Sequence, residues 1–197
     1  LEYPIPDPEP IARVLHGARE DERLTILHVD NANPSIVAES LEPATEITKT
    51  LVETLSDGAV LSFGLESADP TVHEQNWLNC DPQQLRTAVR LVNEHGRERG
   101  ERGLPKLLPG LNFIAGLNGE TVESYQMNLE LLQSMREEGL WLRRINIRQV
   151  EGQGFQEIPK QAFSEFKREV REGIDRPLLE EMLPVGTVLR KVWWETH

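Results

Sequence analysis

The amino-acid sequence predicts an α/β protein built around a parallel sheet. Four times along the chain, a short β-rich run ends in polar residues and leads into an amphipathic helix. The predicted order of elements is αβαβαβαβα, and this alternation indicates parallel strands joined by right-handed crossovers. Ligands bind outside the carboxyl ends of the strands in such proteins, so the polar residues that end the four runs should line one pocket.

The first half of the chain is predicted to hold two helices and two strands. Asp7 followed by Pro8 is a good N-cap and first helical residue, and Gly58 lies where a later helix must stop. In order, we expect a helix from Asp7 with an apolar stripe of Ile11, Val14, Leu15 and Ala18, a strand over 24–30, a helix over 43–55 and a strand over 59–66.

The second half has the clearest helix. Asp81, Pro82 and Gln84 supply an N-cap, a first-turn proline and a capping-box glutamine, and Gly96 closes the helix. We then expect a Gly- and Arg-rich loop over 97–110, a strand over 111–116, a helix over 121–138, a strand over 144–150 and a helix over 159–172.

The alternation stops after Ile174. We therefore expect a barrel-like domain over 1–174 and a C-terminal extension, or the start of a following segment, over 175–197. Residues 185–194 have the composition of an extended tail whose adjacent Trp193 and Trp194 favour burial.

Composition limits the class of protein. The 197 residues are 38% hydrophobic and 27% charged, as in a globular cytoplasmic protein, and apolar runs fall far short of the ~20 residues that span a bilayer. No basic leader precedes an apolar stretch. Cys80 is the single cysteine, so this chain alone cannot form an internal disulfide, an all-cysteine zinc site or a cysteine-ligated iron–sulfur cluster.

Charge argues against nucleic acid as a direct partner. The net charge is −12, with 33 acidic and 21 basic residues, and such a surface repels a phosphate backbone unless the bases cluster. An acid-rich, lysine-poor surface also fits a halophilic cytoplasm, where screening weakens self-repulsion.

Alternation within the strands assigns side chains to two faces. Apolar residues at 61, 63 and 65, and at 145 and 147, should face the helices, which leaves the alternate positions for the lumen of a barrel. That inner set is mostly polar or small, unlike a sheet covered on both faces. It comprises His28, Asp30, Ser62, Gly64, Glu66, Asn112, Gly116, Asn146 and Arg148, with Ile26 and Ile114 as apolar exceptions.

Structural alternatives exist for most of these residues. Glu66 could cap the turn after its strand, and Arg148 could pair with Glu66 or Asp30. His28 could be a hydrogen-bonded core histidine. Asn31 and Asn33, just before a proline, could simply form a turn.

Three segments resemble radical S-adenosylmethionine (radical SAM) enzymes. SFGLESADP over 62–70 resembles their fourth strand, and NFIAGLNGET over 112–121 resembles their fifth, where many members read I-x-G-x-P-G-E-T. RRINIRQV over 143–150 is similar to the sixth strand of an uncharacterised archaeal subgroup described as predicted Fe–S oxidoreductases. The resemblance spans roughly residues 5–190 and implies strands three to six of a parallel (βα) partial TIM barrel.

The resemblance also implies a cofactor site. Glu66 and Ser67 match positions that contact the ribose or amino-acid end of S-adenosylmethionine, and the strand from Ile114 to Gly116 matches the support of adenine. Arg148, or else Arg144, would bind the methionyl carboxylate. The predicted cofactor-binding set is Glu66, Ser67, Asn112, Ile114, Gly116, Asn146 and Arg148, and the residues on the substrate side are His28, Asp30, Asn31 and Asn33.

The family's CxxxCxxC loop is absent, and Asn118 stands where proline is common. We therefore expect the first two strands and the loop that binds the 4Fe–4S cluster to lie upstream of Leu1. In the family, the cluster gives one electron to S-adenosylmethionine, and the resulting 5′-deoxyadenosyl radical abstracts hydrogen from a substrate. The parent protein would then be an iron–sulfur oxidoreductase of unknown substrate, and this segment alone would be inactive.

Two other functions fit the sequence. One is a barrel enzyme that uses its glutamate and arginine side chains in acid–base catalysis, and the other is a cluster-less module that serves as a scaffold or partner surface. A strand over 24–30 with no neighbour would be an open edge, so we also expect self-association through it.

Overall fold

The computed structural model describes residues 4–150, 152 and 159–192. Its centre is a four-stranded parallel sheet in the order β1-β2-β3-β4, which confirms the α/β class and the parallel sheet. The strands are β1 (Asn31–Ala32), β2 (Ala59–Glu66), β3 (Leu107–Ala115) and β4 (Arg144–Gln149).

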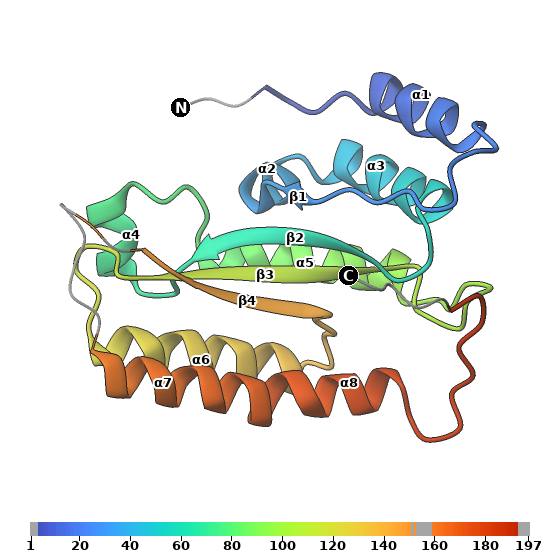
Figure 1. Cartoon of the computed structure of the whole chain (residues 1–197). Helices are drawn as coiled ribbons and strands as arrows, with labels where there is room; N and C mark the ends of the chain where they lie inside the picture. Colours follow the sequence, from blue (N-terminus) through green and yellow to red (C-terminus); the bar gives the residue numbers. More distant parts are fainter. Residues whose placement is uncertain (1–3, 151, 153–158, 193–197) are drawn as a thin grey trace.

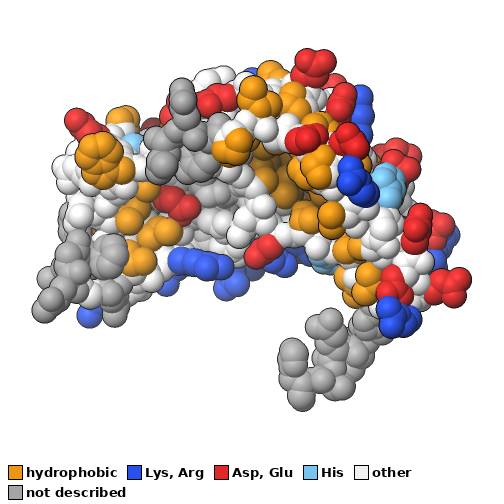
Figure 2. All heavy atoms as spheres, turned by 90° about the horizontal axis from the view of Figure 1, so that it is seen from above, with side chains coloured by type: hydrophobic (Ala, Val, Ile, Leu, Met, Phe, Trp, Pro, Cys, Tyr) orange, Lys and Arg blue, Asp and Glu red, His pale blue; other side chains and the backbone are white. Residues whose placement is uncertain are grey.

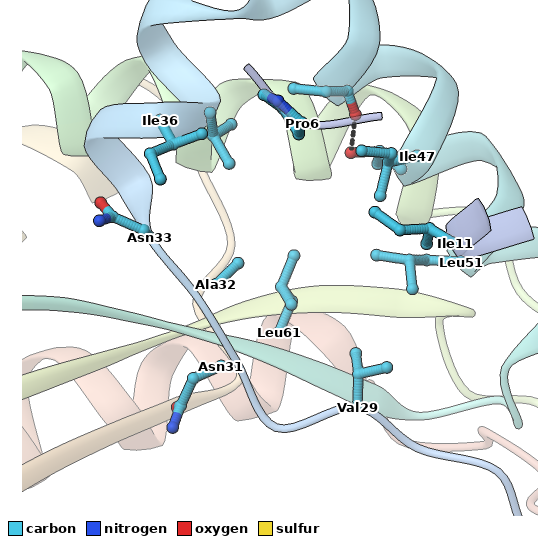
Figure 3. A pocket seen from close by; sticks show the side chains of 13 residues that line it. Pro6, Ile11, Val29, Asn31, Ala32, Asn33, Ile36, Ile47, Leu51 and Leu61 are labelled. Atoms are coloured by element: carbon cyan, nitrogen blue, oxygen red, sulfur yellow. Dashed lines mark hydrogen bonds between the residues drawn. The ribbon is translucent and has the colours of Figure 1, made fainter. Parts of the chain in front are cut away.

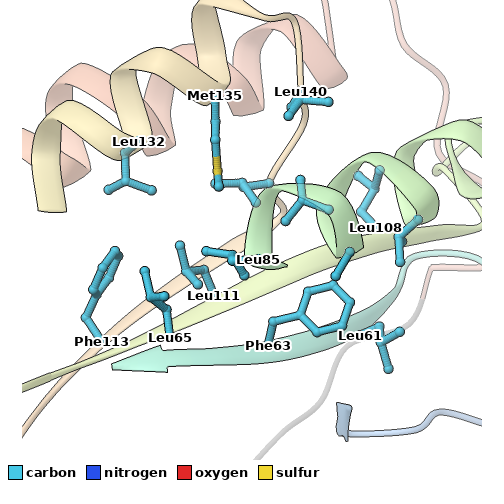
Figure 4. Packing of buried hydrophobic residues seen from close by; sticks show 14 of the residues in the cluster. Leu61, Phe63, Leu65, Leu85, Leu108, Leu111, Phe113, Leu132, Met135 and Leu140 are labelled. Carbon is cyan, nitrogen blue, oxygen red and sulfur yellow. The ribbon is translucent and has the colours of Figure 1, made fainter. Parts of the chain in front are cut away.

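Helices lie around the sheet (Figure 1). In this view α5 is behind it, α6, α7 and α8 are below, and α2 and α3 are above. The strands follow one another in spatial order, unlike those of a doubly wound sheet, and α5 and α6 pack on the same face of β2 and β3 (Figure 4). The helices are α1 (Pro8–Arg19), α2 (Pro34–Glu39), α3 (Leu41–Thr54), α4 (Pro70–Asn76), α5 (Pro82–Gly96), α6 (Val122–Glu137), α7 (Lys160–Glu169), the π-helix η1 (Val170–Asp175) and α8 (Arg176–Met182).

The core lies between the sheet and these helices (Figure 4). Phe63, Leu111 and Phe113 point from the strands toward α5 and α6 and are almost completely buried. Leu85 of α5 and Met135 of α6 meet them from the other side. The helix-facing positions predicted from alternation are therefore confirmed for β2 and β3.

Four helices begin with an Asx–Pro pair. Asp7, Asn33, Asp69 and Asp81 each accept a backbone N–H through the side chain at the N-cap, and a proline follows as the first helical residue. This chemistry satisfies N–H groups that the helix leaves free and fixes the first φ angle. The starts of α1 and α5 were predicted from it, whereas α2 and α4 were missed because each is a short helix with no apolar stripe to read.

The predicted strand over 24–30 is wrong. The regular strand in this region is β1, with two residues, and 24–30 is an extended run beside β2. The Ser56 N–H donates to the Leu27 carbonyl and the Ser62 N–H donates to the Asp30 carbonyl, at 3.0 and 2.9 Å. Between these two bonds the run over 24–30 advances three residues, whereas the stretch that leads into β2 advances six. The two stretches therefore cannot form a continuous ladder of hydrogen bonds. The self-association expected through 24–30 depends on a regular strand edge, and the structure has no regular strand over these residues.

Two other boundaries differ from prediction. β3 begins at Leu107, inside the predicted loop over 97–110, because Leu107 and Leu108 are buried. The last helix continues past Ile174 through η1 into α8, where Leu178 and Met182 join the same core. The wide turn of a π-helix accommodates Pro177, which would clash in a regular α-helix. Trp193 and Trp194 lie outside the described residues.

Within the part of the chain that the structure describes, no helix is both long and apolar enough to cross a lipid bilayer.

Candidate functional site

The face of the sheet opposite the helices carries polar side chains in register. Gly64, Asn112 and Asn146 lie side by side on β2, β3 and β4, and Ile114 lies beside Arg148 one step nearer the carboxyl ends. We call this surface, together with Glu66 at the end of β2, the inner face. The phase predicted for Asn146 and Arg148 agrees with this register, whereas a shift in register pairs Glu66 with the buried Phe113.

Glu66 has an unusual conformation. Its φ angle is +70°, a region that non-glycine residues rarely occupy, and it lies at a β-bulge where β2 shifts register against β3. The side chain folds back over Gly64, so that a Cβ at that position would collide with Oε1 of Glu66. Backbone strain of this kind persists where the surrounding structure imposes it, and it is concentrated at functional sites.

One carboxylate oxygen of Glu66 lacks a hydrogen-bond donor. Oε2 is buried and has no partner among the described residues. Burial raises the pKa of the Glu66 carboxyl, and the nearby Arg148 guanidinium lowers it to a smaller extent. A buried acceptor without a donor is costly, and a ligand hydroxyl or amine would supply the missing hydrogen bond.

Arg148 and the two asparagines offer complementary groups. Arg148 is exposed and, in the described part of the chain, makes no ion pair within 4.0 Å, so the predicted alternative of a structural pair with Glu66 or Asp30 is not found there. The side-chain amide of Asn146 donates to Oδ1 of Asn112 at 2.9 Å. This bond orients both amides, and among the described residues the Asn146 Oδ1 and the Asn112 NH₂ group make no other side-chain hydrogen bond that would compete with a ligand.

The turn after β2 is anchored to α6. The Ala68 N–H donates to Oδ1 of Asn128 at 2.6 Å, and the Ser124 hydroxyl donates to Oδ2 of Asp69 at 2.6 Å. Burial raises the pKa of Asp69, but the hydrogen bonds from Ser124 and Thr71 outweigh it and leave the pKa lowered. Ser67 is buried, and its hydroxyl accepts a hydrogen bond from the Asp69 N–H at 3.1 Å. The hydroxyl that was predicted to contact the cofactor therefore makes a hydrogen bond within the turn.

Sequence reasoning missed Ser124 and Asn128. The available signal was two small polar residues four apart on the buried face of α6, among Tyr125, Leu129 and Leu132. Buried polar residues need partners, so this spacing could have indicated a tether to a neighbouring loop.

The loop after β3 is anchored as well. Gly116 has a φ of +96° and donates its N–H to the Glu120 carboxylate, which is only 4% exposed. Asn76 of α4 bonds both the N–H and the carbonyl of Asn118, at 3.1 and 2.8 Å. The backbone of Asn118 is therefore tied to α4, and Gly116, the residue after β3, has no side chain of its own.

His28, one of the four residues predicted on the substrate side, is exposed in the run beside β2. Partial burial, together with Arg102 and Arg144, lowers the pKa of His28, which places the imidazole near those two guanidinium groups. Asp30 is exposed, and its carbonyl pairs with β2. The Asn33 carboxamide caps α2 through the Ser35 N–H and hydroxyl, which matches the structural alternative for that residue.

A separate apolar pocket lies under α1, α2 and α3 (Figure 3). Its volume is about 270 Å³, and seen from above it is a hollow of hydrophobic side chains between acidic ones (Figure 2). Ala32 and Leu61 point into it, whereas Asn31 and Asn33 point away from its centre. The lining is Pro6, Ile11, Val29, Asn31, Ala32, Asn33, Ile36, Val37, Ala44, Ile47, Thr48, Leu51 and Leu61. Asn31 thus borders this pocket.

The described residues do not fit an iron–sulfur cluster. Cys80 is 2% exposed, and burial raises the pKa of its thiol to about 12, so the thiolate that would ligate iron is disfavoured. Over residues 4–150, 152 and 159–192 there is no group of three or more His, Cys, Asp or Glu side chains that could hold a metal ion.

Comparison with known proteins gives relatives but no function. No family model matches the chain. An uncharacterized protein of Methanocaldococcus jannaschii is 40% identical over 204 residues, covering 98% of this chain, and an uncharacterized protein of Archaeoglobus fulgidus is 41% identical over 195 residues, covering 93%. The chain spans only 38% and 37% of the length of these two archaeal proteins.

Glu66 should make stability depend on pH. Its folded pKa is raised, so the folded state holds the proton more tightly and stability falls as the pH rises above the unfolded value. Glu66→Gln removes the ionised form, and we expect the variant to be more stable than the wild type at pH 7 and equal to it near pH 4. Urea unfolding at both pH values measures this, and a variant that is less stable at pH 7 would contradict the assigned burial.

Proposed function

We propose that the inner face binds S-adenosylmethionine, and that the chain is strands three to six of a partial TIM barrel in a longer radical SAM enzyme. Strands in sequential order, with α5 and α6 on one face of β2 and β3 (Figure 4), support the barrel. The observation that carries the binding site is Glu66, whose strained backbone holds a buried oxygen with no donor among the described residues, near Arg148, which makes no ion pair with any of them.

The residues present suit the chemical groups of this cofactor. Glu66 would accept hydrogen bonds from ribose hydroxyls or from the ammonium group, and Arg148 would hold the carboxylate with a two-pronged guanidinium contact. Ile114 offers an apolar surface for adenine, and Gly116 allows close approach of the backbone. The amides of Asn112 and Asn146 provide further hydrogen bonds to the sugar or the amino acid.

A 4Fe–4S cluster would have to be held outside this chain, because the described residues do not fit one. When bound by cysteines elsewhere in a longer protein, such a cluster supplies the single electron for reductive cleavage of S-adenosylmethionine. The task of this chain is then to bind and orient the cofactor and to exclude water from it. By itself it should bind the cofactor without cleaving it.

Equilibrium dialysis with radiolabelled S-adenosylmethionine tests this proposal on the chain itself. We expect saturable binding of one molecule per chain, competition by S-adenosylhomocysteine, and no competition by ATP, which lacks the carboxylate. Arg148→Met should weaken binding by about tenfold or more, the effect of losing one charge-assisted contact. Arg13→Met, on the surface of α1, is the control, and equal affinity of the two variants would contradict the site.

A further inference from the structure

β4 is the last strand in the order of the described sheet. Within the described residues β4 pairs only with β3, and the helical run α7–η1–α8 lies beside it rather than across its edge (Figure 1). The Val150 N–H donates to the Ala115 carbonyl of β3 at 2.9 Å, in the same register as β4, so by alternation the N–H groups of Ile145 and Ile147 face away from the sheet. Free strand-edge groups of this kind are a template for another strand.

A groove runs along this edge. It consists of two cavities of about 370 and 470 Å³ that share Ile145, Arg171 and Asp175. Its apolar residues are the half-buried Ile145 and Ile147 of β4, Val170 of η1, and Leu179 and Met182 of α8. Leu179 is 41% exposed there, so the groove leaves apolar surface uncovered.

The rim of the groove is basic in an otherwise acidic protein. Six cationic side chains line it, Arg143, Arg144, Lys167, Arg168, Arg171 and Arg176, against the two acids Glu172 and Asp175. None of the six makes an ion pair within 4.0 Å in the described part of the chain. The net charge of the whole chain is −12, so this local excess selects for an acidic occupant.

A second copy of the same strand fits poorly. Antiparallel self-pairing of β4 centred on Asn146 would place Arg144 opposite Arg148 of the other copy, and like charges directly opposite are destabilising. A nucleic acid backbone would satisfy the arginines, but it would leave both the strand-edge amides and the apolar floor without partners. Only a polypeptide in extended conformation uses all three features.

We propose that the β4 edge is a docking site for an extended segment of a partner protein, in which acidic and apolar residues alternate. The segment would add to the sheet as a fifth strand. One set of side chains would lie on the apolar floor beside Ile145 and Leu179, and carboxylates would meet the basic rim. The site is independent of the inner face and does not depend on the cofactor.

Selection from a random twelve-residue peptide library against the whole chain tests this proposal. We expect the enriched peptides to alternate acidic and apolar residues. Their affinity, measured by fluorescence anisotropy, should fall about tenfold or more in Arg168→Glu/Arg171→Glu, where attraction becomes repulsion. Leu179→Ser should also weaken binding. Lys49→Glu, an exposed charge reversal on α3 far from the groove, is the matched control and should bind as the wild type does.

Several outcomes would overturn the proposal. These are the absence of enriched peptides, enriched peptides without alternation, or affinity lost equally in Lys49→Glu. A proline introduced at the centre of an enriched peptide should abolish binding, because it removes a strand N–H, and unchanged affinity would also overturn it. Full competition by an oligonucleotide, or a dimer lost in Arg168→Glu/Arg171→Glu by sedimentation velocity, would assign the groove to nucleic acid or to a second copy instead.

Discussion

Replacing Glu66 or Arg148 by alanine in the longer parent protein is expected to abolish reductive cleavage of S-adenosylmethionine while leaving the fold intact. In the proposed site each side chain would make a charge-assisted contact that the other cannot replace, and a contact of that kind contributes about 1.5–3 kcal/mol, or roughly 10- to 100-fold in affinity. Both residues border the inner face and neither contributes to the hydrophobic core. The experiment is anaerobic reconstitution followed by quantification of 5′-deoxyadenosine.

Matched surface changes separate loss of the cofactor site from general damage. Glu46→Ala on α3 and Arg13→Ala on α1 remove the same charges from exposed positions and should cleave the cofactor at the wild-type rate. Circular dichroism should show that all four variants keep the wild-type secondary structure. Wild-type cleavage in both Glu66→Ala and Arg148→Ala would remove the roles proposed for these residues.

The largest effect on stability is expected for Gly96→Ala. Gly96 ends α5 against the start of β3, and a Cβ there would overlap the carbonyl oxygen of Leu107 and lie 3.0 Å from the Leu107 Cβ. The neighbour is backbone inside the sheet and cannot move aside, so we expect a loss of about 3 kcal/mol in the free energy of unfolding. Urea denaturation measures the change.

Gly17→Ala is the matched control for that variant. Gly17 lies inside α1, and a Cβ there meets nothing within 4 Å, so alanine should stabilise the protein by roughly 0.5–1 kcal/mol through its higher helix propensity. Equal stability of Gly96→Ala and the wild type would contradict the close packing of α5 against β3.

Local rules predicted the regular elements well. The strand over 59–66 and the helix after Asp81 have the expected bounds, because each combines a clear apolar period with a start or stop residue. The run over 24–30 has an apolar pattern too. It can pair regularly only if the neighbouring stretch covers the same distance with the same number of residues, and that depends on the tertiary structure. Helices α2 and α4 are too short for a period, although their Asx–Pro starts were readable.

The candidate site was predictable only in part. Alternation alone assigned Glu66, Asn146 and Arg148 to one face, and the strand register agrees for Asn146 and Arg148, while Glu66 reaches that face through its side chain, which folds over Gly64. The tether joins elements more than 50 residues apart in sequence, through the bonds from Asn128 to Ala68 and from Ser124 to Asp69, and the left-handed φ of Glu66 occurs where β2 shifts register against β3. The polar spacing on α6 could indicate that a tether exists, but no pattern within one segment identifies its partner.

A crystal structure of the parent protein with bound S-adenosylmethionine is the most direct measurement. We expect the methionyl carboxylate within about 3.2 Å of the Arg148 guanidinium, and a ribose hydroxyl or the ammonium group donating to the oxygen of Glu66 that has no donor at present. Cofactor bound in the apolar pocket beneath α1 and α3, with Glu66 still lacking a donor, would contradict the account.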